Sequence, residues 1–195
     1  MSLKDLPARD RIVAATIKII GQEGMPSLTT RKIAQEADVN IAAINYYFGS
    51  KDKLIELAFE KTMDEMAGLS EDLLDLQQLD DRERVRVFLA GLMGGAIKYP
   101  GLVKAHLYPT FVHNDYDTLF VKRFNLFLTD IYDRVSALKS KDKKQDLKIA
   151  LVQMMSAILL PAVFPKIFQD FSQIDFENLE ARKAYIDRLL HYYLD

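Results

Sequence analysis

Residues 38–54 read DVNIAAINYYFGSKDKL, and this stretch decides the fold that we predict for the chain. Asn40 suits the N-cap of a helix, because its side-chain oxygen can accept a hydrogen bond from a free N–H of the first turn. The isoleucines that follow are three residues apart, as on one face of a helix. Gly49 suits the end of that helix, and Ser50 suits the cap of the next. The stretch predicts a short helix over 40–46 and a longer helix that starts near Ser50.

Another short helix precedes this one. Thr29 can cap a helix over 29–36, and the letters ADV separate it from the helix that starts at Asn40. Asp38 in that connection tolerates the left-handed backbone that a tight turn requires. With an earlier helix over 7–22, the arrangement is a helix-turn-helix domain. The residues predicted to face its core are Ile12, Ala15, Thr16, Ile19, Ile33, Ala34, Ala37, Val39, Ile44 and Phe48.

The small and polar residues of the two short helices suit contact with DNA. A helix that enters the major groove needs such residues at its N-terminal end, where Ile41 and Ala42 can touch thymine methyl groups. Tyrosine hydroxyls at the other end suit phosphate oxygens. Lys51 adds a positive charge beside the open amides of the next helix, which also favours a phosphate. The predicted DNA-binding residues are Thr29, Thr30, Arg31, Asn40, Ile41, Ala42, Ala43, Asn45, Tyr46, Tyr47 and Lys51.

The stretch from Leu28 to Leu54 closely resembles the DNA-binding region of the tetracycline-repressor (TetR-like) family. That family's pattern is roughly T-x-R-x-I-A-x-x-A-G-V-S-x-x-x-L-Y-x-H-F-x-S-K-x-x-L. The matching positions are Thr29, Arg31, Ile33, Ala34, Ala37, Val39, Phe48, Ser50, Lys51 and Leu54. The departures are Asp38 for Gly, Asn40 for Ser, Asn45 for Tyr and Tyr47 for His, all physically mild. The resemblance covers roughly residues 10–58 and implies a transcriptional regulator, with repression as the family expectation.

Apolar stripes with helical spacing fill the rest of the chain, and no window alternates with the period of a strand. We therefore predict an all-α protein. Its N-terminal three-helix helix-turn-helix DNA-binding domain is expected over 1–50. A C-terminal helical ligand-binding and dimerisation domain, which the resemblance implies, is expected over 51–195.

Two C-terminal stretches are the candidates for a dimer interface. Residues 145–164 and 176–194 are too apolar all round for the surface helices of a monomer, although plain core burial would also explain them. Pro161 and Pro165 are expected to kink or end the first of them, and Pro109 is expected to end a short helix before it. A homodimer is also expected because one recognition helix reads few base pairs, and a two-fold partner doubles that number.

The resemblance further implies a small-molecule effector of unknown identity. We expect its binding to tilt the helix that begins near Ser50 and so to release a palindromic operator in double-stranded DNA. Aromatic and Met residues in the C-terminal part suit either an apolar pocket or an ordinary core. The predicted ligand-binding residues are Phe88, Met93, His106, Tyr108, Phe111, Tyr116, Phe120, Phe124 and Met154. No cofactor is expected, and no metal site, because His106 and His113 would lack further ligands.

Composition argues against several other classes of protein. The 195 residues include no Cys and carry a formal charge of −2. No apolar run approaches the roughly 18 residues of a membrane span, and the N-terminus lacks the apolar core of a signal peptide. We therefore expect a cytoplasmic protein without a membrane partner. Residues 1–55 carry eight basic and six acidic residues, a small positive excess that permits contact with nucleic acid.

Two other functional classes are alternatives to a regulator. An enzyme is not expected, because no zinc-binding His motif, no nucleophile with a base and no Gly-rich phosphate loop is present. A helical lipid or ligand carrier would explain the C-terminal part but would leave residues 29–54 without a role. Salt-dependent binding of duplex DNA separates a regulator from such a carrier.

Overall fold

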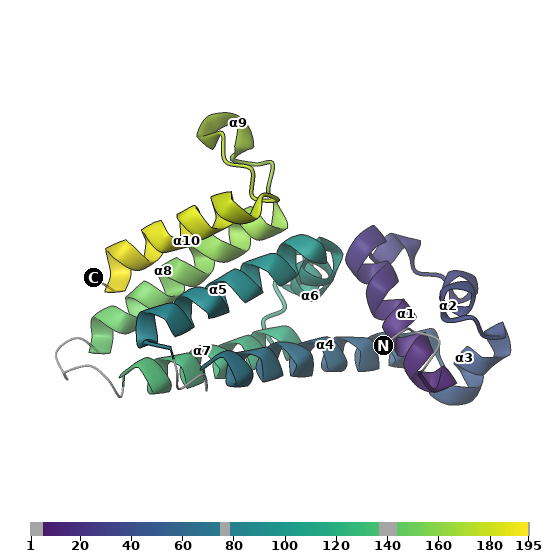
Figure 1. Cartoon of the computed structure of the whole chain (residues 1–195). Helices are drawn as coiled ribbons and strands as arrows, with labels where there is room; N and C mark the ends of the chain where they lie inside the picture. Colours follow the sequence, from purple (N-terminus) through teal and green to yellow (C-terminus); the bar gives the residue numbers. More distant parts are fainter. Residues whose placement is uncertain (1–5, 75–78, 137–143, 195) are drawn as a thin grey trace. The chain divides into compact units, whose positions relative to one another are not determined.

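The computed structural model describes residues 6–74, 79–136 and 144–194. Every regular element within these ranges is a helix, which confirms the all-α prediction (Figure 1).

The N-terminal helices follow the predicted boundaries closely. α1 spans Ala8–Glu23, α2 spans Thr30–Ala37, α3 spans Ile41–Phe48 and α4 spans Lys51–Leu74. A short 3-10 turn, η2 at Met25–Ser27, links α1 to α2 and was not predicted. Helices as short as α2 and α3 are marginal in isolation. Their stability therefore comes from packing against their neighbours.

Further helices follow α4. Those described are α5 at Asp81–Lys98, α6 at Pro100–His113, α7 at Leu119–Ser136, α8 at Lys144–Val163, α9 at Gln169–Ser172 and α10 at Leu179–Leu194. The two stretches predicted as dimer candidates correspond to α8 and α10. The four-residue α9 lies in the connection between them and was not predicted.

Two prolines lie inside helices. The predicted helix end at Pro109 is wrong, because α6 continues to His113. A proline inside a helix lacks one N–H and its ring crowds the carbonyl four residues earlier. The Pro109 carbonyl nevertheless accepts from the N–H of Asn114, which ends the helix with a φ of 52°. In α8, Pro161 is also internal, and the helix ends before Pro165, as predicted for that pair.

Packing divides the chain into two compact units. Unit 1 comprises Met1–Met66 and Lys98–Leu119, and unit 2 comprises Ala67–Ile97 and Phe120–Asp195. Unit 1 therefore adds the first part of α4 and all of α6 to the helix-turn-helix. The predicted boundary at residue 50 divides the chain by function, and it stays a prediction.

The core of unit 1 joins α1 to the two short helices that lie beside it (Figure 1). Every residue predicted to face this core is buried, except Val39, which packs against it partly buried. Thr16 is buried as well, and its hydroxyl donates to Ile12 O at 2.8 Å. Fully burying one Ile side chain stabilises a protein by roughly 1.5–3 kcal/mol. Because these residues are buried, the prediction of the helix-turn-helix core is confirmed.

α1 and α6 approach each other closely at two glycines. A Cβ on Gly101 would lie 2.0 Å from Ile20 O, and a Cβ on Gly21 would lie 2.8 Å from Tyr99 Cδ1. Any larger residue at Gly101 would meet the backbone itself, which cannot turn aside as a side chain can. Glycine at this position is therefore what allows α6 to pack against α1 within unit 1.

His106 of α6 is buried against α4 within unit 1. Thr62 Oγ1 donates to Phe59 O at 2.9 Å and lies 3.0 Å from His106 Nε2. Since the hydroxyl has one hydrogen, it accepts from Nε2, which assigns a ring proton to that nitrogen. The Phe59 ring also lies 4.4 Å from the imidazole, between centroids. Burial lowers the pKa of His106 from 6.5 to about 4, so the ring is neutral near pH 7.

Aromatic rings fill part of unit 2 between α5 and α7. The Phe88 and Phe127 centroids are 5.2 Å apart, and Phe124 lies 6.1 Å from Phe127 and 5.6 Å from Phe120. Offset and tilted ring pairs at such distances stabilise a core beyond the area that they bury. These four residues form the aromatic cluster of unit 2.

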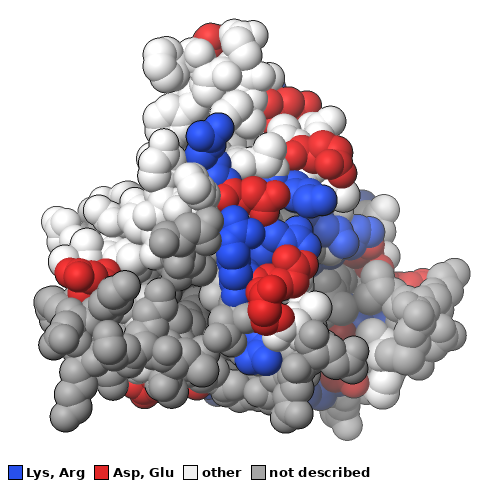
Figure 2. Space-filling view, turned by 60° about the vertical axis from the view of Figure 1, so that its left-hand side comes forward, with Lys and Arg blue, Asp and Glu red and all other residues white. Residues whose placement is uncertain are grey.

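α10 contacts both α8 and α5 within unit 2. The Tyr185 hydroxyl donates to Ala157 O of α8 at 2.9 Å. Arg182 of α10 packs against Gly94 of α5, where a Cβ would lie 3.3 Å from Nη1. Figure 2 shows Lys and Arg side chains gathered with Asp and Glu side chains between them, so the face in view is of mixed sign.

Among the described helices, only α8 is both long and apolar enough to cross a membrane by length and composition. Its window Asp146–Val163 has a mean hydropathy of 1.6, enough for a membrane span by that measure alone. Half of the window is buried inside the protein. The same composition therefore suits the core helix of a soluble protein.

Candidate nucleic-acid interface

Local hydrogen bonds fix the start of α2, the turn and the start of α3. The Thr29 side chain accepts from Lys32 N–H at 3.2 Å, and the Asn40 side chain accepts from Ala42 N–H at 2.9 Å. Between them, Asp38 has a φ of 54° and a ψ of 55°. Both predicted caps and the predicted left-handed turn residue are therefore confirmed.

α3 buries one face and exposes the other. Ile44 is fully buried and Phe48 is 8% exposed, whereas Ile41 is 49% exposed and Tyr46 is 83% exposed. Ala42, beside Ile41 in the first turn, is also exposed. The N-terminal end of α3 thus presents small and apolar side chains to solvent. This is the shape that entry into a major groove requires.

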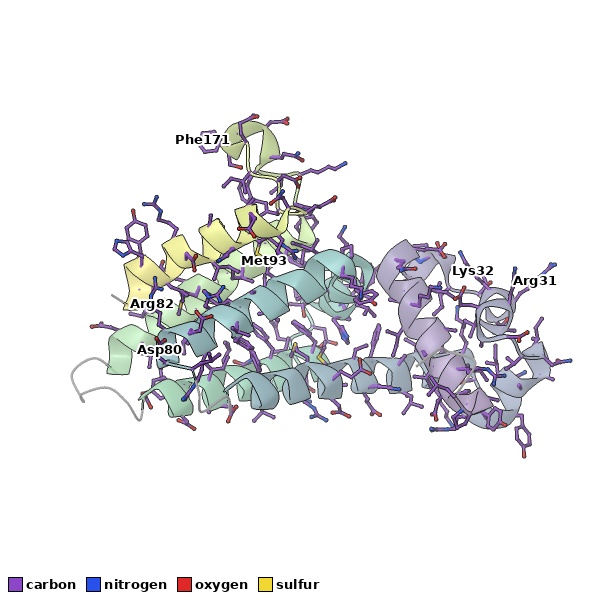
Figure 3. All side chains as sticks on the ribbon, in the orientation of Figure 1. Arg31, Lys32, Asp80, Arg82, Met93 and Phe171 are labelled. Atoms are coloured by element: carbon purple, nitrogen blue, oxygen red, sulfur yellow. The ribbon has the colours of Figure 1, made fainter. Side chains whose placement is uncertain are left out.

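The structure gathers the predicted DNA-binding residues on α2, α3 and the residues that flank them in unit 1. Thr29, Arg31, Asn40, Ile41, Ala42, Asn45, Tyr46 and Tyr47 are exposed, and Thr30, Ala43 and Lys51 are half-buried. Figure 3 shows Arg31 projecting outward from α2. Contact of each of these residues with DNA stays a prediction.

Two tyrosines stand together near the C-terminal end of α3. The rings of Tyr46 and Tyr47 meet edge to face, with centroids 5.0 Å apart. Tyr47 is 41% exposed, so both residues keep much of their surface in solvent. An exposed aromatic pair with two hydroxyls is suited to a partner rich in hydrogen-bond acceptors, such as a phosphate backbone.

Two lysines of this region already have protein partners. Lys51 Nζ donates to Leu28 O at 3.2 Å, and Lys32 forms an ion pair with Glu23. An ammonium has three hydrogens, so Lys51 keeps donors for a phosphate. It also ties the start of α4 to the segment before α2. Sequence reasoning missed this structural role, because the two residues are 23 positions apart.

Sequence reasoning also missed Arg11 of α1. Its guanidinium donates to two carbonyl oxygens at the left-handed turn, those of Ala37 and Asp38. The partners lie 26 and 27 positions away, and no local pattern signals such a contact.

Five of the predicted ligand-binding residues lie in unit 2. Phe88, Met93, Phe120 and Met154 are buried, and Phe124 is half-buried. Three of them belong to the aromatic cluster of unit 2. Burial suits both a core and the wall of an apolar pocket, so their role towards a ligand stays a prediction.

The other four predicted ligand-binding residues lie in unit 1. His106 is buried, whereas Tyr108 is 56%, Phe111 is 73% and Tyr116 is 65% exposed. Their role towards a ligand also stays a prediction. Within the described part of the chain, no three His, Asp or Glu residues are grouped as metal ligands would be.

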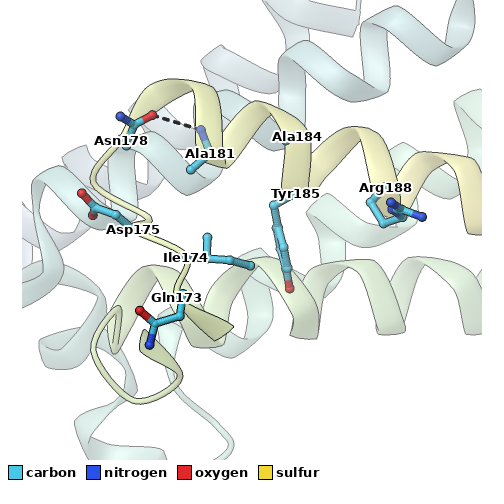
Figure 4. Close-up of a pocket in the computed structure, with 8 residues that line it drawn as sticks. All are labelled: Gln173, Ile174, Asp175, Asn178, Ala181, Ala184, Tyr185 and Arg188. Carbon is cyan, nitrogen blue, oxygen red and sulfur yellow. Dashed lines mark hydrogen bonds between the residues drawn. The ribbon is translucent and has the colours of Figure 1, made fainter. Parts of the chain in front are cut away.

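Unit 2 also has an open pocket that no predicted residue lines. It has a volume of about 570 Å³ and lies between the connection that precedes α10 and α10 itself (Figure 4). Its lining residues are Gln173, Ile174, Asp175, Asn178, Ala181, Ala184, Tyr185 and Arg188. Asn178 serves as the cap of α10, since its side-chain oxygen accepts from Glu180 and Ala181 N–H.

A capped helix that follows a left-handed turn and exposes its N-terminal end defines a helix-turn-helix protein. Residues 12–58 match the family model for bacterial regulatory proteins of the tetR family. The predicted resemblance to the TetR family is therefore confirmed.

Curated regulators match parts of the chain. The HTH-type transcriptional dual regulator CecR of Shigella flexneri is 48% identical over 54 residues, which are 28% of this chain and 24% of CecR. The HTH-type transcriptional regulator BetI of Burkholderia ambifaria is 27% identical over 82 residues, 42% of each chain. The chain thus matches less than half the length of these relatives.

Solved structures match nearly the whole chain. A TetR-like transcriptional regulator from a Rhodococcus species has a TM-score of 0.65 at 16% identity, covering 94% of this chain and 95% of its own. The multidrug binding protein EbrR, complexed with malachite green, has a TM-score of 0.57 at 20% identity, covering 93% and 96%. At these identities the similarity establishes the fold: an N-terminal helix-turn-helix followed by further helices.

Proposed function

We propose that this protein is a ligand-responsive transcriptional regulator that binds a palindromic operator as a homodimer and is released by a small molecule. The observation that carries the proposal is the first turn of α3, which is capped by Asn40 and exposes Ile41 and Ala42. The match of residues 12–58 to a family of bacterial regulators supports the same function. Repression is the sign of regulation that we propose.

In the proposed complex, α3 lies in the major groove with its N-terminal end at the bases. Ile41 and Ala42 contact thymine methyl groups, and Asn45 reads an adenine edge. Arg31, Tyr47 and Lys51, with their neighbours on α2 and α3, hold phosphates on the two sides of the groove. Base contacts then select the operator, whereas phosphate contacts fix the position of the domain on it.

Selection of duplexes from a random pool by the full-length protein tests this function. We expect a palindrome whose half-sites are about 10 base pairs apart, the spacing that a two-fold dimer requires. Affinity for the selected duplex should fall steeply as salt rises. The proposal would be contradicted if the protein enriches no duplex and shows no salt-dependent binding of duplex DNA, as expected of a helical carrier.

Exposed apolar residues on α8 and α10 support the homodimer. Ile149 is 51%, Val152 is 58% and Leu160 is 45% exposed on α8, and Tyr192 is 72% exposed on α10. The three α8 residues recur at helical spacing and so lie along one side of that helix. Exposed apolar side chains gathered on one side of a helix suit a protein contact. Sedimentation equilibrium across a dilution series tests it, and a monomer at micromolar concentration would exclude this dimer.

The effector that we propose is an apolar or aromatic small molecule that binds within unit 2. The buried aromatic and Met residues of unit 2 would supply the walls of its site. EbrR, which shares the fold, was solved as a complex with malachite green. In a mobility-shift assay, at least one compound from a panel of aromatic cations and apolar acids should dissociate the complex with the operator. Ligand and DNA should weaken each other by the same factor.

A ligand carrier is the second candidate, and it would show no salt-dependent binding of duplex DNA. An enzyme is not proposed, because the relatives are named as transcriptional regulators. A regulator of this kind acts where the chromosome lies, so we propose a cytoplasmic location.

A further inference from the structure

Arg11, in the first turn of α1, contacts the end of α2 and the turn that follows it. Its Nε donates to Ala37 O at 2.9 Å, and its Nη2 donates to Asp38 O at 3.2 Å. Its Nη1 donates to Leu6 O at 3.2 Å, before α1 begins. Each of the three guanidinium nitrogens therefore already holds a backbone carbonyl.

Two of these carbonyls belong to the end of α2 and to the turn that leads into α3. The last carbonyls of a helix lack partners within it and carry the negative end of its dipole, so a cation stabilises them. The N–H groups of Asp38 and Val39 bond back to Gln35 O and Ala34 O, at 3.3 and 3.0 Å. Arg11 holds the carbonyl side of the same turn. The peptides just before α3 are thus fixed from both sides.

A neighbouring arginine contacts the other end of α3. The guanidinium carbon of Arg9 lies 5.6 Å from the centroid of the Phe48 ring. Phe48 is the last residue of α3 and is buried. A cation above an aromatic face is attracted to it, but weakly where the cation is exposed, as Arg9 is. The start of α1 therefore contacts both the turn that precedes α3 and the last residue of α3, with the stronger contact at the turn.

We propose that Arg11 is a positioning residue for DNA recognition, which fixes the angle at which α3 meets the major groove. This inference rests on the proposed DNA-binding function. A phosphate contact is the competing role, but Arg11 is half-buried and three of its five N–H donors are bonded to carbonyls. A lysine cannot replace it, because one flexible ammonium lacks the rigid fork of donors that spans the carbonyls of the turn.

The test compares full-length wild type with Arg11→Lys and Arg11→Gln, and with Arg9→Gln as the control. Each protein is titrated with the duplex that wild type selects and with a scrambled duplex of equal length, over a range of NaCl concentrations. Circular dichroism sets a temperature at which every variant is folded. Amide hydrogen exchange over residues 39–44 is measured without DNA.

We expect Arg11→Lys and Arg11→Gln to lose about 10-fold in affinity for the selected duplex, the size of one lost base contact. Affinity for the scrambled duplex and both salt slopes should stay close to wild type, because no phosphate contact is removed. Exchange over residues 39–44 should become faster. Arg9→Gln should show the smaller effect on every readout.

Two results would overturn the proposal. One is a salt slope lowered by about 0.9 in Arg11→Gln with equal losses on both duplexes, which marks a phosphate contact. The other is wild-type affinity for the selected duplex in a folded Arg11→Gln protein. If Arg11→Gln does not fold, Arg11→Lys decides by the same criteria. If wild type selects no duplex, the proposed function fails, and exchange over residues 39–44 alone decides whether Arg11 holds α3.

Discussion

The helix-turn-helix of unit 1 and the C-terminal helices of unit 2 expose different kinds of surface. α3 presents Ile41 and Ala42 beside polar and tyrosine side chains, and hydrogen bonds fix its start. α8 instead presents Ile149, Val152 and Leu160 along one side. Figure 3 adds Phe171, which projects outward from α9 in the same unit and is 93% exposed.

This difference separates two kinds of partner. A mixed surface on a narrow, capped helix suits a groove lined by base edges and phosphates. A helix side with several exposed apolar residues suits another protein surface, because burial of apolar area is the main term that stabilises such a contact. Substitutions on α3 should therefore leave dimerisation intact, and substitutions on the exposed side of α8 should leave DNA contact by α3 intact.

Ala42→Glu should give the largest effect. A carboxylate at the tip of α3 meets the phosphate-lined groove, so operator affinity should fall to the non-specific level, at least about 1,000-fold. Because Ala42 is exposed, folding and dimerisation should be unchanged. Gln22→Glu, an exposed position at the end of α1, is the matched control in the mobility-shift assay. Normal binding by a folded Ala42→Glu protein would show that α3 is not the groove helix.

His106→Gln should remove a pH dependence of unit 1 stability. The folded pKa of His106 is about 4 against 6.5 unfolded. Between these values the unfolded state binds a proton that the folded state excludes, so stability falls as pH falls. This loss amounts to about 3 kcal/mol below pH 4 and is absent above pH 6.5.

The measurement is urea unfolding of wild type and His106→Gln at pH 7.5, 5.5 and 4. Gln cannot titrate, yet its amide can still donate to Thr62. The free energies of unfolding of the two proteins should therefore change differently as pH falls. Parallel curves would mean that His106 titrates freely in the folded protein, in contradiction to its burial.

Val152→Glu should weaken the dimer by at least about 2 kcal/mol, or roughly 30-fold in its dissociation constant, because it buries an unpaired charge. The two-fold axis places the charge on both sides of the interface. The exposed site leaves the fold of each subunit intact. Val152→Thr should give a smaller effect in sedimentation equilibrium. A dimer equally tight in all three proteins would place the interface elsewhere.

Lys51→Met should give the smallest effect. Removing one phosphate contact lowers the salt slope of DNA binding by about 1 and weakens binding to all duplexes alike. Methionine keeps much of the aliphatic stem but loses the bond to Leu28 O. Lys51→Arg, which keeps the charge, should retain the wild-type slope. An unchanged slope in Lys51→Met would assign Lys51 to the structural contact alone.

The sequence predicted the helices and the helix-turn-helix core well because their signals are local. Thr29 and Asn40 bond to amides three and two residues further along, and Asp38 adopts its left-handed conformation within one turn. The prediction that a helix ends at Pro109 is wrong for a non-local reason. A proline inside a helix loses its own hydrogen bond and crowds the carbonyl four residues earlier, and whether the next turn still forms depends on what it packs against.

The sequence by itself determined which helices form, which faces are apolar and which residues cap α2 and α3, since each depends on neighbours within one or two turns. Only the tertiary structure decided the contacts of Arg11 with the turn, of Lys51 with Leu28 and of His106 with Thr62. Their partners lie 23 to 44 positions away. A hydrogen bond is set by distance and angle in space, and chain folding brings such residues together without a mark in the local pattern.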